Sequence, residues 1–167
     1  IAGGIPAGAY GLSAELAERI LSDESADIVD TGGVGGTLAG NALSVAAMRA
    51  TLEHVLTDEA FAGMIAVADR YTAGVRQVLA AHQAPWSIVQ LGARAEYRFA
   101  PRPPRTGGES EAAADTGLDE YLHLYLVNRG ILLTPFHNMA LMCPATTQAD
   151  ADEHTRVFAD AAGELFG

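Results

Sequence analysis

The spacing of apolar positions along the chain predicts helices that alternate with short strands. Apolar residues recur at helical spacing in residues 13–21 and again in residues 41–56, which predicts two helices. Ser13 and Asn41 stand at the start of these segments and are suitable N-cap residues. A short strand is expected between the helices, over residues 27–31. We do not expect the first fifty residues to form a domain alone.

The next part of the chain predicts a long helix followed by extended structure. The helix is expected over residues 58–82, with acidic residues in its first turn. The stretch WSIVQLGARAEYRFAP, residues 86–101, forms two strands or one bent strand, with Gly92 marking the bend or bulge. Residues 101–117 are rich in Pro, Gly and acidic side chains, and are expected to form a loop or a disordered segment.

Four further elements are expected toward the C-terminal end. They are a helix, two short strands and a final helix, over residues 118–130, 131–136, 139–144 and 146–165. Gly130 suits the C-cap of the first of these helices. Thr147 and Asp150 form an acidic variant of the capping box at the start of the last one. The chain therefore divides into residues 1–57 and an α+β module of residues 58–167.

Composition is typical of a globular domain. The 167 residues are 49% apolar and 19% charged. No apolar run reaches the ~18 residues that suggest a membrane span, and no secretory leader is visible. A net charge of −11 argues against a nucleic-acid-binding surface. Cys143 is the single cysteine, which excludes an internal disulfide and is typical of a reducing compartment, so we expect a cytoplasmic protein.

Two features of the whole chain are unusual, namely its basic residues and its opening stretch. All ten basic residues are arginine, and lysine is absent. The opening stretch, IAGGIPAGAYG, has no Met and carries the apolar, glycine-rich pattern of a domain interior. We therefore expect residue 1 to lie inside a longer polypeptide.

A glycine-rich stretch, GGVGGTLAGNALSVAA at residues 32–47, runs into the helix predicted over residues 41–56. Backbone N–H groups beside glycines can approach an anion closely at such a place. The alternative is an ordinary tight turn in which glycine supplies positive φ angles. The stretch by itself leaves both interpretations open.

Three segments together resemble one family, the class III aminotransferases, which are pyridoxal-phosphate enzymes of fold type I. The nearest branch is that of the glutamate-1-semialdehyde 2,1-aminomutases. IAGGIPAGAYG resembles the strand and turn after the family's catalytic lysine, GGTLAGNALSVAA its phosphate-loop motif, and NRGILLTPFHNMALMCPATTQADADEHTRVF its C-terminal strand pair and last helix. The resemblance covers essentially the whole chain. It implies an α/β fold, with residues 1–57 ending the cofactor-binding large domain and residues 58–167 forming the α+β C-terminal small domain.

The resemblance also implies a cofactor site. Gly36 and Thr37 match the residues that bind the phosphate of pyridoxal 5′-phosphate in the neighbouring subunit of a homodimer, and an amide with a hydroxyl suits a dianionic phosphate. Ala42 replaces the family's proline. The Schiff-base lysine is expected two residues before Ile1, so no catalytic residue is expected in the chain itself. The upstream half is either a separate segment or has been removed.

Two residues are candidates for binding substrate. In GARAEYRF a regular strand places Arg94, Glu96 and Arg98 on one face. Arg94, beside the glycine bend, could pair with a substrate carboxylate; the alternative is an exposed strand face on which Arg and Glu pair. His137 stands about where aminomutase-like relatives carry Glu, and could be a polar group at the substrate entrance. The alternative is a solvated or packed histidine.

Other reactive residues give weaker signals. Tyr10 is expected either to lie near the cofactor, because it is close in sequence to the missing lysine, or to pack at a turn. Cys143 falls in an apolar stretch and is expected in the core rather than as a nucleophile. No metal site is expected, because four histidines have no partner at metal-ligand spacing: His54, His82, His123 and His154.

The expected function is therefore that of the C-terminal part of a pyridoxal-phosphate-dependent aminotransferase. Its partners would be a small-molecule amino donor, a keto acid, a second subunit and the N-terminal part of the same enzyme. The first alternative is an aminomutase, which moves the amino group within one molecule; His137 and Asn138 in place of the expected acid argue against it. The second is a non-catalytic dimerisation remnant, suggested by the absence of lysine.

Overall fold

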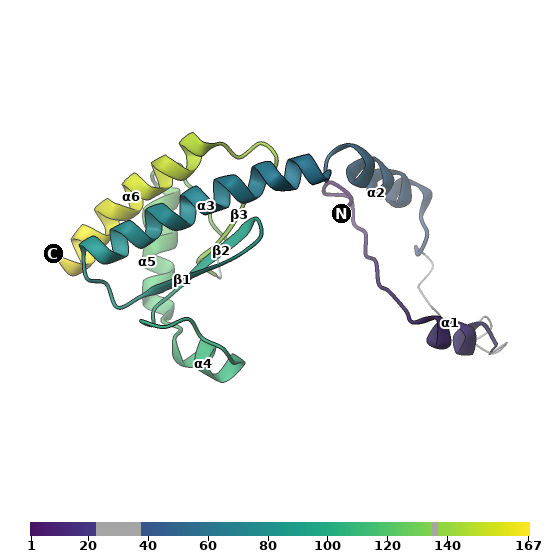
Figure 1. The fold of residues 1–167 in the computed structure, drawn as a ribbon, viewed down its shortest axis with the longest axis horizontal. Coiled ribbons are helices and arrows are strands. Elements are labelled where there is room, and N and C mark those ends of the chain that lie inside the picture. Colours follow the sequence, from purple (N-terminus) through teal and green to yellow (C-terminus); the bar gives the residue numbers. More distant parts are fainter. Residues whose placement is uncertain (23–37, 135–136) are drawn as a thin grey trace. The chain divides into compact units, whose positions relative to one another are not determined.

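The computed structural model describes residues 1–22, 38–134 and 137–167. The chain divides into two compact units, Ile1–Thr57 and Asp58–Gly167, drawn in Figure 1. The strand predicted over residues 27–31 lies outside the described residues. Among the helices that are described, none combines the length and apolar character needed to cross a membrane.

In the residues of the first unit that the structure describes, 1–22 and 38–57, there are two helices, α1 (Ala14–Leu21) and α2 (Ala42–His54). The side chains of Ser13 and Asn41 accept hydrogen bonds from backbone N–H groups of the first turns, so both predicted N-caps are confirmed. No residue of either helix is buried. The opening segment is joined to α2 by Ser44, whose hydroxyl donates to the carbonyl of Pro6 over 2.9 Å.

The second unit is a three-stranded antiparallel sheet with helices packed on it. Its elements in chain order are α3 (Asp58–Ala81), β1 (Ser87–Leu91), β2 (Arg94–Arg98), α4 (Gly107–Ala112), α5 (Thr116–Val127), β3 (Met139–Leu141) and α6 (Gln148–Phe166). The strand order is β1-β2-β3, and both strand pairs are antiparallel. The hairpin of β1 and β2 turns at Gly92, whose φ of +57° favours glycine. The predicted bend is thus a tight turn between two strands.

Helices α3 and α6 run side by side over the sheet, and α5 contacts α6 (Figure 1). The core lies between these helices and one face of the sheet, and its largest fully buried side chains include Tyr71, Tyr97 and Phe158. The rings of Tyr97 and Phe158 lie 5.0 Å apart, so β2 and α6 meet through aromatic contact. Gly74 allows α3 to approach α6 closely, because a Cβ there would overlap the side chain of Thr155.

Four predictions of local structure need correction. Residues 101–117 include a short helix, α4, whose N-cap Thr106 accepts a hydrogen bond from the N–H of Glu109. Ile131–Thr134 is not a strand: the N–H of Ile131 donates to Leu126 at the end of α5, and the side chains of Ile131 and Leu133 pack on the core. Helix α5 is capped by Asn128, two residues before Gly130. Cys143 is exposed and follows β3, whereas a place in the core was expected.

The predicted capping box of the last helix is confirmed. Thr147 accepts a hydrogen bond from the N–H of Asp150 over 3.3 Å, and the carboxylate of Asp150 accepts one from the N–H of Thr147 over 2.7 Å. This reciprocal pair satisfies two backbone donors that the helix itself leaves without partners. The local sequence therefore specifies where α6 begins.

Candidate functional site

The outward face of β2 carries a buried carboxylate between arginines. Ala95 and Tyr97 point into the core and are 1% and 0% exposed, so Arg94, Glu96 and Arg98 share the opposite face, as the strand alternation predicts. Only 9% of the Glu96 side chain is exposed. Nη2 of Arg94 donates to Oε2 of Glu96 over 2.9 Å, and Nη1 of Arg98 lies 3.5 Å from Oε1. A buried carboxylate needs such partners, since an unpaired buried charge is costly.

His137 joins the same carboxylate from a distant part of the chain. Its Nδ1 lies 3.4 Å from Oε1 of Glu96, and 43% of its side chain is exposed. The hydroxyl of Thr134 donates to the carbonyl of His137 over 2.7 Å, which holds the backbone here. The structure therefore brings the two candidate substrate residues, Arg94 and His137, onto one acidic group. It also shows the Arg–Glu pairing that was the alternative interpretation of this strand face.

The position of His137 is fixed by its neighbour Asn138, which is 6% exposed. Nδ2 of Asn138 donates to Oδ1 of Asp119 on α5 over 2.6 Å. The carbonyl of Asn138 accepts a hydrogen bond from the N–H of Tyr97 over 3.3 Å. The turn that carries His137 is thus tied both to α5 and to β2.

The two arginines differ in how firmly they are held. Nη2 of Arg98 also donates to the hydroxyl of Ser110 on α4, and the Arg98 side chain is only 21% exposed. The Arg94 side chain is 49% exposed. Five residues line a shallow hollow on this face: Val89, Gln90, Leu91, Arg94 and Glu96. Arg94 is therefore the cation of this group that can best exchange its partner for an incoming carboxylate.

Glu96 is the residue whose importance the sequence analysis missed. It was placed on the face of the two arginines, yet no functional role was assigned to it. The sequence feature that could have identified Glu96 is its position between Arg94 and Arg98 in a strand, since a carboxylate flanked in this way can neutralise both arginines. Its contact with His137 joins segments far apart in the sequence, and periodicity carries no information about such a contact.

The two predicted phosphate ligands, Gly36 and Thr37, lie outside the described residues. The start of α2 nevertheless limits where an anion could bind. Oδ1 of Asn41 accepts hydrogen bonds from the N–H groups of Leu43 and Ser44 over 3.0 and 3.2 Å. Those two donors are therefore not available to an anion.

Tyr10 and Cys143 were the other reactive residues singled out in the sequence. Tyr10 belongs to the first unit and is 65% exposed. Thr146 donates to Sγ of Cys143 over 3.3 Å, and this hydrogen bond holds the pKa of the exposed thiol below its usual value. Within the part of the chain that the structure describes, no three His, Cys, Asp or Glu side chains gather in a way that could hold a metal ion.

Comparison with known proteins gives a consistent result. No protein-family model matches the chain. It is 31% identical to the glutamate-1-semialdehyde 2,1-aminomutase of Bacillus subtilis over 91% of its own length and 33% of the relative's length. A glutamate-1-semialdehyde-aminomutase of Pseudomonas aeruginosa, solved in complex with PMP, matches with a TM-score of 0.86 and 47% identity, over 93% of this chain and 35% of that one. A β-phenylalanine aminotransferase of Variovorax paradoxus, at 24% identity, matches with a TM-score of 0.69 and shares the fold.

The fold is that of the pyridoxal-phosphate-dependent aminotransferases of fold type I. Within this class, the chain is a homologue of the glutamate-1-semialdehyde 2,1-aminomutase group of class III aminotransferases and corresponds to a C-terminal portion of them. The resemblance inferred from the three sequence motifs is thereby confirmed. The chain spans about a third of the length of the curated relatives that it matches.

Proposed function

We propose that the protein carrying this chain is a pyridoxal-phosphate-dependent enzyme that moves an amino group between an amino compound and a keto acid. The observation that supports this most strongly is the 47% identity, over 93% of the chain, to an aminomutase solved with PMP. When bound, the cofactor supplies an electron sink for charge that develops beside the reacting carbon. The chain has no lysine, so a catalytic lysine has to come from other residues of the protein.

We assign the phosphate of the cofactor to Gly36 and Thr37. The assignment rests on the match to the phosphate-loop motif. In this proposal the loop serves the cofactor of a neighbouring subunit, so the active protein is a homodimer. The amide of Gly36 or Thr37 and the hydroxyl of Thr37 then donate to a doubly charged group.

We assign the carboxylate of the substrate to Arg94, with His137 beside it. Both side chains are about half exposed and both lie against Glu96, which is itself buried. Glu96 holds the side chains of Arg94 and His137 in place while no substrate is present. A substrate carboxylate replaces Glu96 as the partner of Arg94, and the second oxygen of Glu96 keeps its contact with Arg98.

The test of the reaction uses the intact protein. Addition of pyridoxal phosphate should produce an absorbance band near the visible edge, and a panel of amino donors with keto acids should show transamination. Conversion of glutamate 1-semialdehyde without an added amino acceptor would instead support the aminomutase, which the names of the relatives favour. No band and no amino transfer would support the remaining candidate, a non-catalytic dimerisation module, and would overturn the proposal.

The phosphate assignment is tested by substitution of Thr37. Thr37→Ala removes one hydroxyl donor and should weaken cofactor retention by about 1–3 kcal/mol, the cost of leaving a buried polar partner unpaired. Thr37→Ser keeps the hydroxyl and is the matched control. Cofactor release can be followed by equilibrium dialysis, and the dimer by sedimentation. Equal retention in the alanine and serine variants would contradict the assignment.

The substrate assignment is tested by substitution of Arg94. Arg94→Ala should raise KM for a carboxylate substrate by roughly 10- to 100-fold, as expected for a lost charge-assisted hydrogen bond. It should leave KM for an amine without a carboxylate unchanged. Arg76→Ala, on the exposed side of α3, is a control for the loss of a positive charge. A similar change in KM for both substrates would argue that Arg94 has only a structural role.

A further inference from the structure

The outward face of the sheet in the second unit has apolar side chains on both sides of its charged strand. Residues that are paired across antiparallel strands share a face of the sheet. The register pairs Arg94 of β2 with Leu91 of β1 on one side and with Leu141 of β3 on the other. It also pairs Glu96 with Val89 of β1. The charged side chains of β2 therefore have apolar neighbours on both sides.

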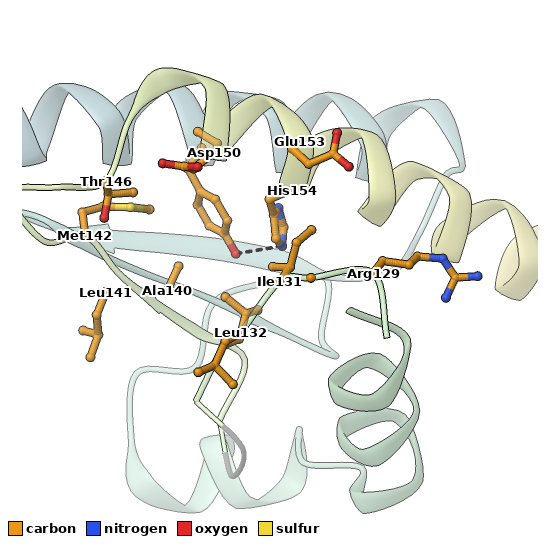
Figure 2. A pocket seen from close by; sticks show the side chains of 14 residues that line it. Arg129, Ile131, Leu132, Ala140, Leu141, Met142, Thr146, Asp150, Glu153 and His154 are labelled. Carbon is orange, nitrogen blue, oxygen red and sulfur yellow. Dashed lines mark hydrogen bonds between the residues drawn. The ribbon is translucent and has the colours of Figure 1, made fainter. Parts of the chain in front are cut away.

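These apolar side chains are accessible and are not part of the core. Leu91 is 79% exposed, Leu141 59% and Val89 42%. In Figure 2 the side chain of Leu141 points away from His154, whereas its neighbour Ala140 is only 5% exposed. Apolar surface therefore lies directly beside the accessible arginine of this face, where a molecule that the arginine binds would touch it.

A hollow of about 190 Å³ joins this apolar surface to Arg94. Val89 and Leu91 supply the apolar part of its lining, and Arg94 supplies the cation. The side-chain amide of Gln90, which also belongs to the lining, donates to Oδ1 of Asp69 over 2.8 Å and is therefore already used. The volume is sufficient for a branched group of several carbon atoms, because a cavity of about 150 Å³ accepts benzene.

Among the residues that the structure describes, this hollow offers one site for a carboxylate. Arg98, the other arginine of the face, is not in the lining; its side chain is 21% exposed and its guanidinium donates to Ser110. His137 precedes β3, whereas the hollow lies on β1 at the other side of β2, and His137 is not in the lining. A second carboxylate in the hollow would thus lose water without gaining a partner, whereas an apolar group would be stabilised there by its removal from water.

We propose that the substrate is an amino or keto acid with a single carboxylate, which pairs with Arg94, and an apolar side group, which lies in the hollow against Val89 and Leu91. This substrate class rests on the proposed assignment of the substrate carboxylate to Arg94, and it adds the nature of the group attached to that carboxylate. Val89 and Leu91 are then residues that determine specificity. A branched aliphatic group fits the hollow, and a second carboxylate at the same place is disfavoured.

The test compares 4-methylpentanoate with succinate, two unreactive acids of nearly the same shape. The fourth carbon carries two methyl groups in the first and two oxygens in the second, and propanoate lacks this group altogether. Each acid is titrated into the intact protein with pyridoxal phosphate bound, and binding is followed by calorimetry or by ligand-detected NMR. We expect 4-methylpentanoate to bind about tenfold tighter than propanoate, which is about 1.4 kcal/mol and corresponds to partial burial of three carbon atoms. Succinate should bind within about twofold of propanoate, since its second carboxylate gains no partner.

Substitutions in the hollow connect this preference to its residues. Leu91→Ala, at a 79% exposed position, should reduce the tenfold gain to about threefold or less and leave propanoate binding unchanged. Val89→Ala should act in the same direction and is the second variant. Leu124→Ala, at a 59% exposed position on α5 that does not line the hollow, is the matched control and should keep the full gain. Arg94→Ala should weaken propanoate and 4-methylpentanoate to a similar degree.

The outcomes separate the substrate class from the reaction, because the binding series needs no turnover. Succinate binding as tight as that of 4-methylpentanoate, no gain over propanoate, or no saturable binding of any of the three acids would overturn the substrate class. So would a full gain that persists in both Leu91→Ala and Val89→Ala, as expected if another part of the protein covers these side chains. A protein that shows the apolar preference but no amino transfer would overturn the proposed reaction alone.

Discussion

The two units of the chain differ in how far their apolar side chains are buried. Among the residues that the structure describes, the eighteen buried residues of the hydrophobic core cluster all belong to the second unit. In the first unit neither helix has a buried residue, and large apolar side chains such as Leu21, Leu43 and Leu52 are 84%, 66% and 51% exposed. The second unit is therefore stabilised by packing, whereas the helices of the first unit are specified mainly by their N-caps.

This difference has a consequence for mutations. In the second unit a substitution should act through cavities, overlaps and buried polar groups, which cost several kcal/mol. In the first unit the same kind of substitution should have only a small effect on stability. The fluorescence of Trp86, the single tryptophan of the sequence, reports unfolding of the second unit because the residue is 8% exposed and packs in its core.

The largest effect is expected for Phe158→Ala. Phe158 is fully buried and packs against Tyr97 and Trp86, so truncation leaves a cavity that should cost about 3–5 kcal/mol of stability. Leu43→Ala in the first unit is the matched comparison and should change stability by less than about 0.5 kcal/mol. Urea denaturation followed by Trp86 fluorescence measures both. A loss of several kcal/mol for Leu43→Ala would mean that Leu43 is buried in the intact protein.

The next effect is a dependence of stability on pH that His154 produces. Burial lowers its pKa to about 3 in the folded state from 6.5, so the unfolded state binds a proton that the folded state does not. Stability should therefore fall as the pH falls below about 6.5, by about 1.4 kcal/mol for each pH unit, and this loss should end near pH 3. The slope is best measured between about pH 6 and pH 5, before the carboxylates titrate.

His154→Phe should remove most of that slope, whereas Tyr71→Phe should keep it because the buried imidazole remains. The carboxylates of Asp150, Asp152 and Glu153 have pKa values held below their usual range by hydrogen bonds, so their contribution is lost only at lower pH. If the slope between pH 6 and pH 5 is the same with and without His154, then the imidazole is not buried in the neutral form.

A smaller loss is expected for Gly74→Ala, which tests the close approach of α3 to α6. The added methyl group would overlap the side chain of Thr155, so the helices must shift apart, at a cost of about 1–3 kcal/mol. Thr155→Ala removes the overlapping atoms. The double variant should therefore recover part of the loss in urea denaturation. Additive effects of the two substitutions would show that the helices do not meet at this point.

The parts of this structure that could be predicted are those that depend on local sequence. Ser13, Asn41 and Thr147 each accept a hydrogen bond from an N–H no more than three residues away, so the chain itself identifies them. The common face of Arg94, Glu96 and Arg98 follows from the two-residue period of a strand. Gly92 at the β1–β2 turn was also visible in the local sequence, because a glycine inside a strand pattern marks a bend or a bulge.

The parts that could not be predicted depend on distant neighbours. Ile131–Thr134 has the apolar character of a strand, but the side chains of Ile131 and Leu133 pack on the core and its backbone joins no sheet. The approach of His137 to Glu96 and the unpaired Nδ1 of His154 arise from the packing of separate elements. The candidate site was therefore predicted as a set of residues, while the carboxylate that unites them was found only in three dimensions.

The smallest effects, about 1 kcal/mol each, are expected for the two helix caps. Thr147→Ala removes the hydroxyl that accepts from the N–H of Asp150 at the start of α6, and α6 is packed along α3 in the core. The loss of stability in this variant should therefore appear in the unfolding that Trp86 fluorescence reports. Asn41→Ala removes an equivalent cap from α2, but that helix has no buried residue. The loss of this cap should appear as faster hydrogen exchange at the first amides of α2, while the unfolding reported by Trp86 fluorescence is unchanged. An equal loss in Trp86 unfolding for both variants would contradict the difference in packing between the two units.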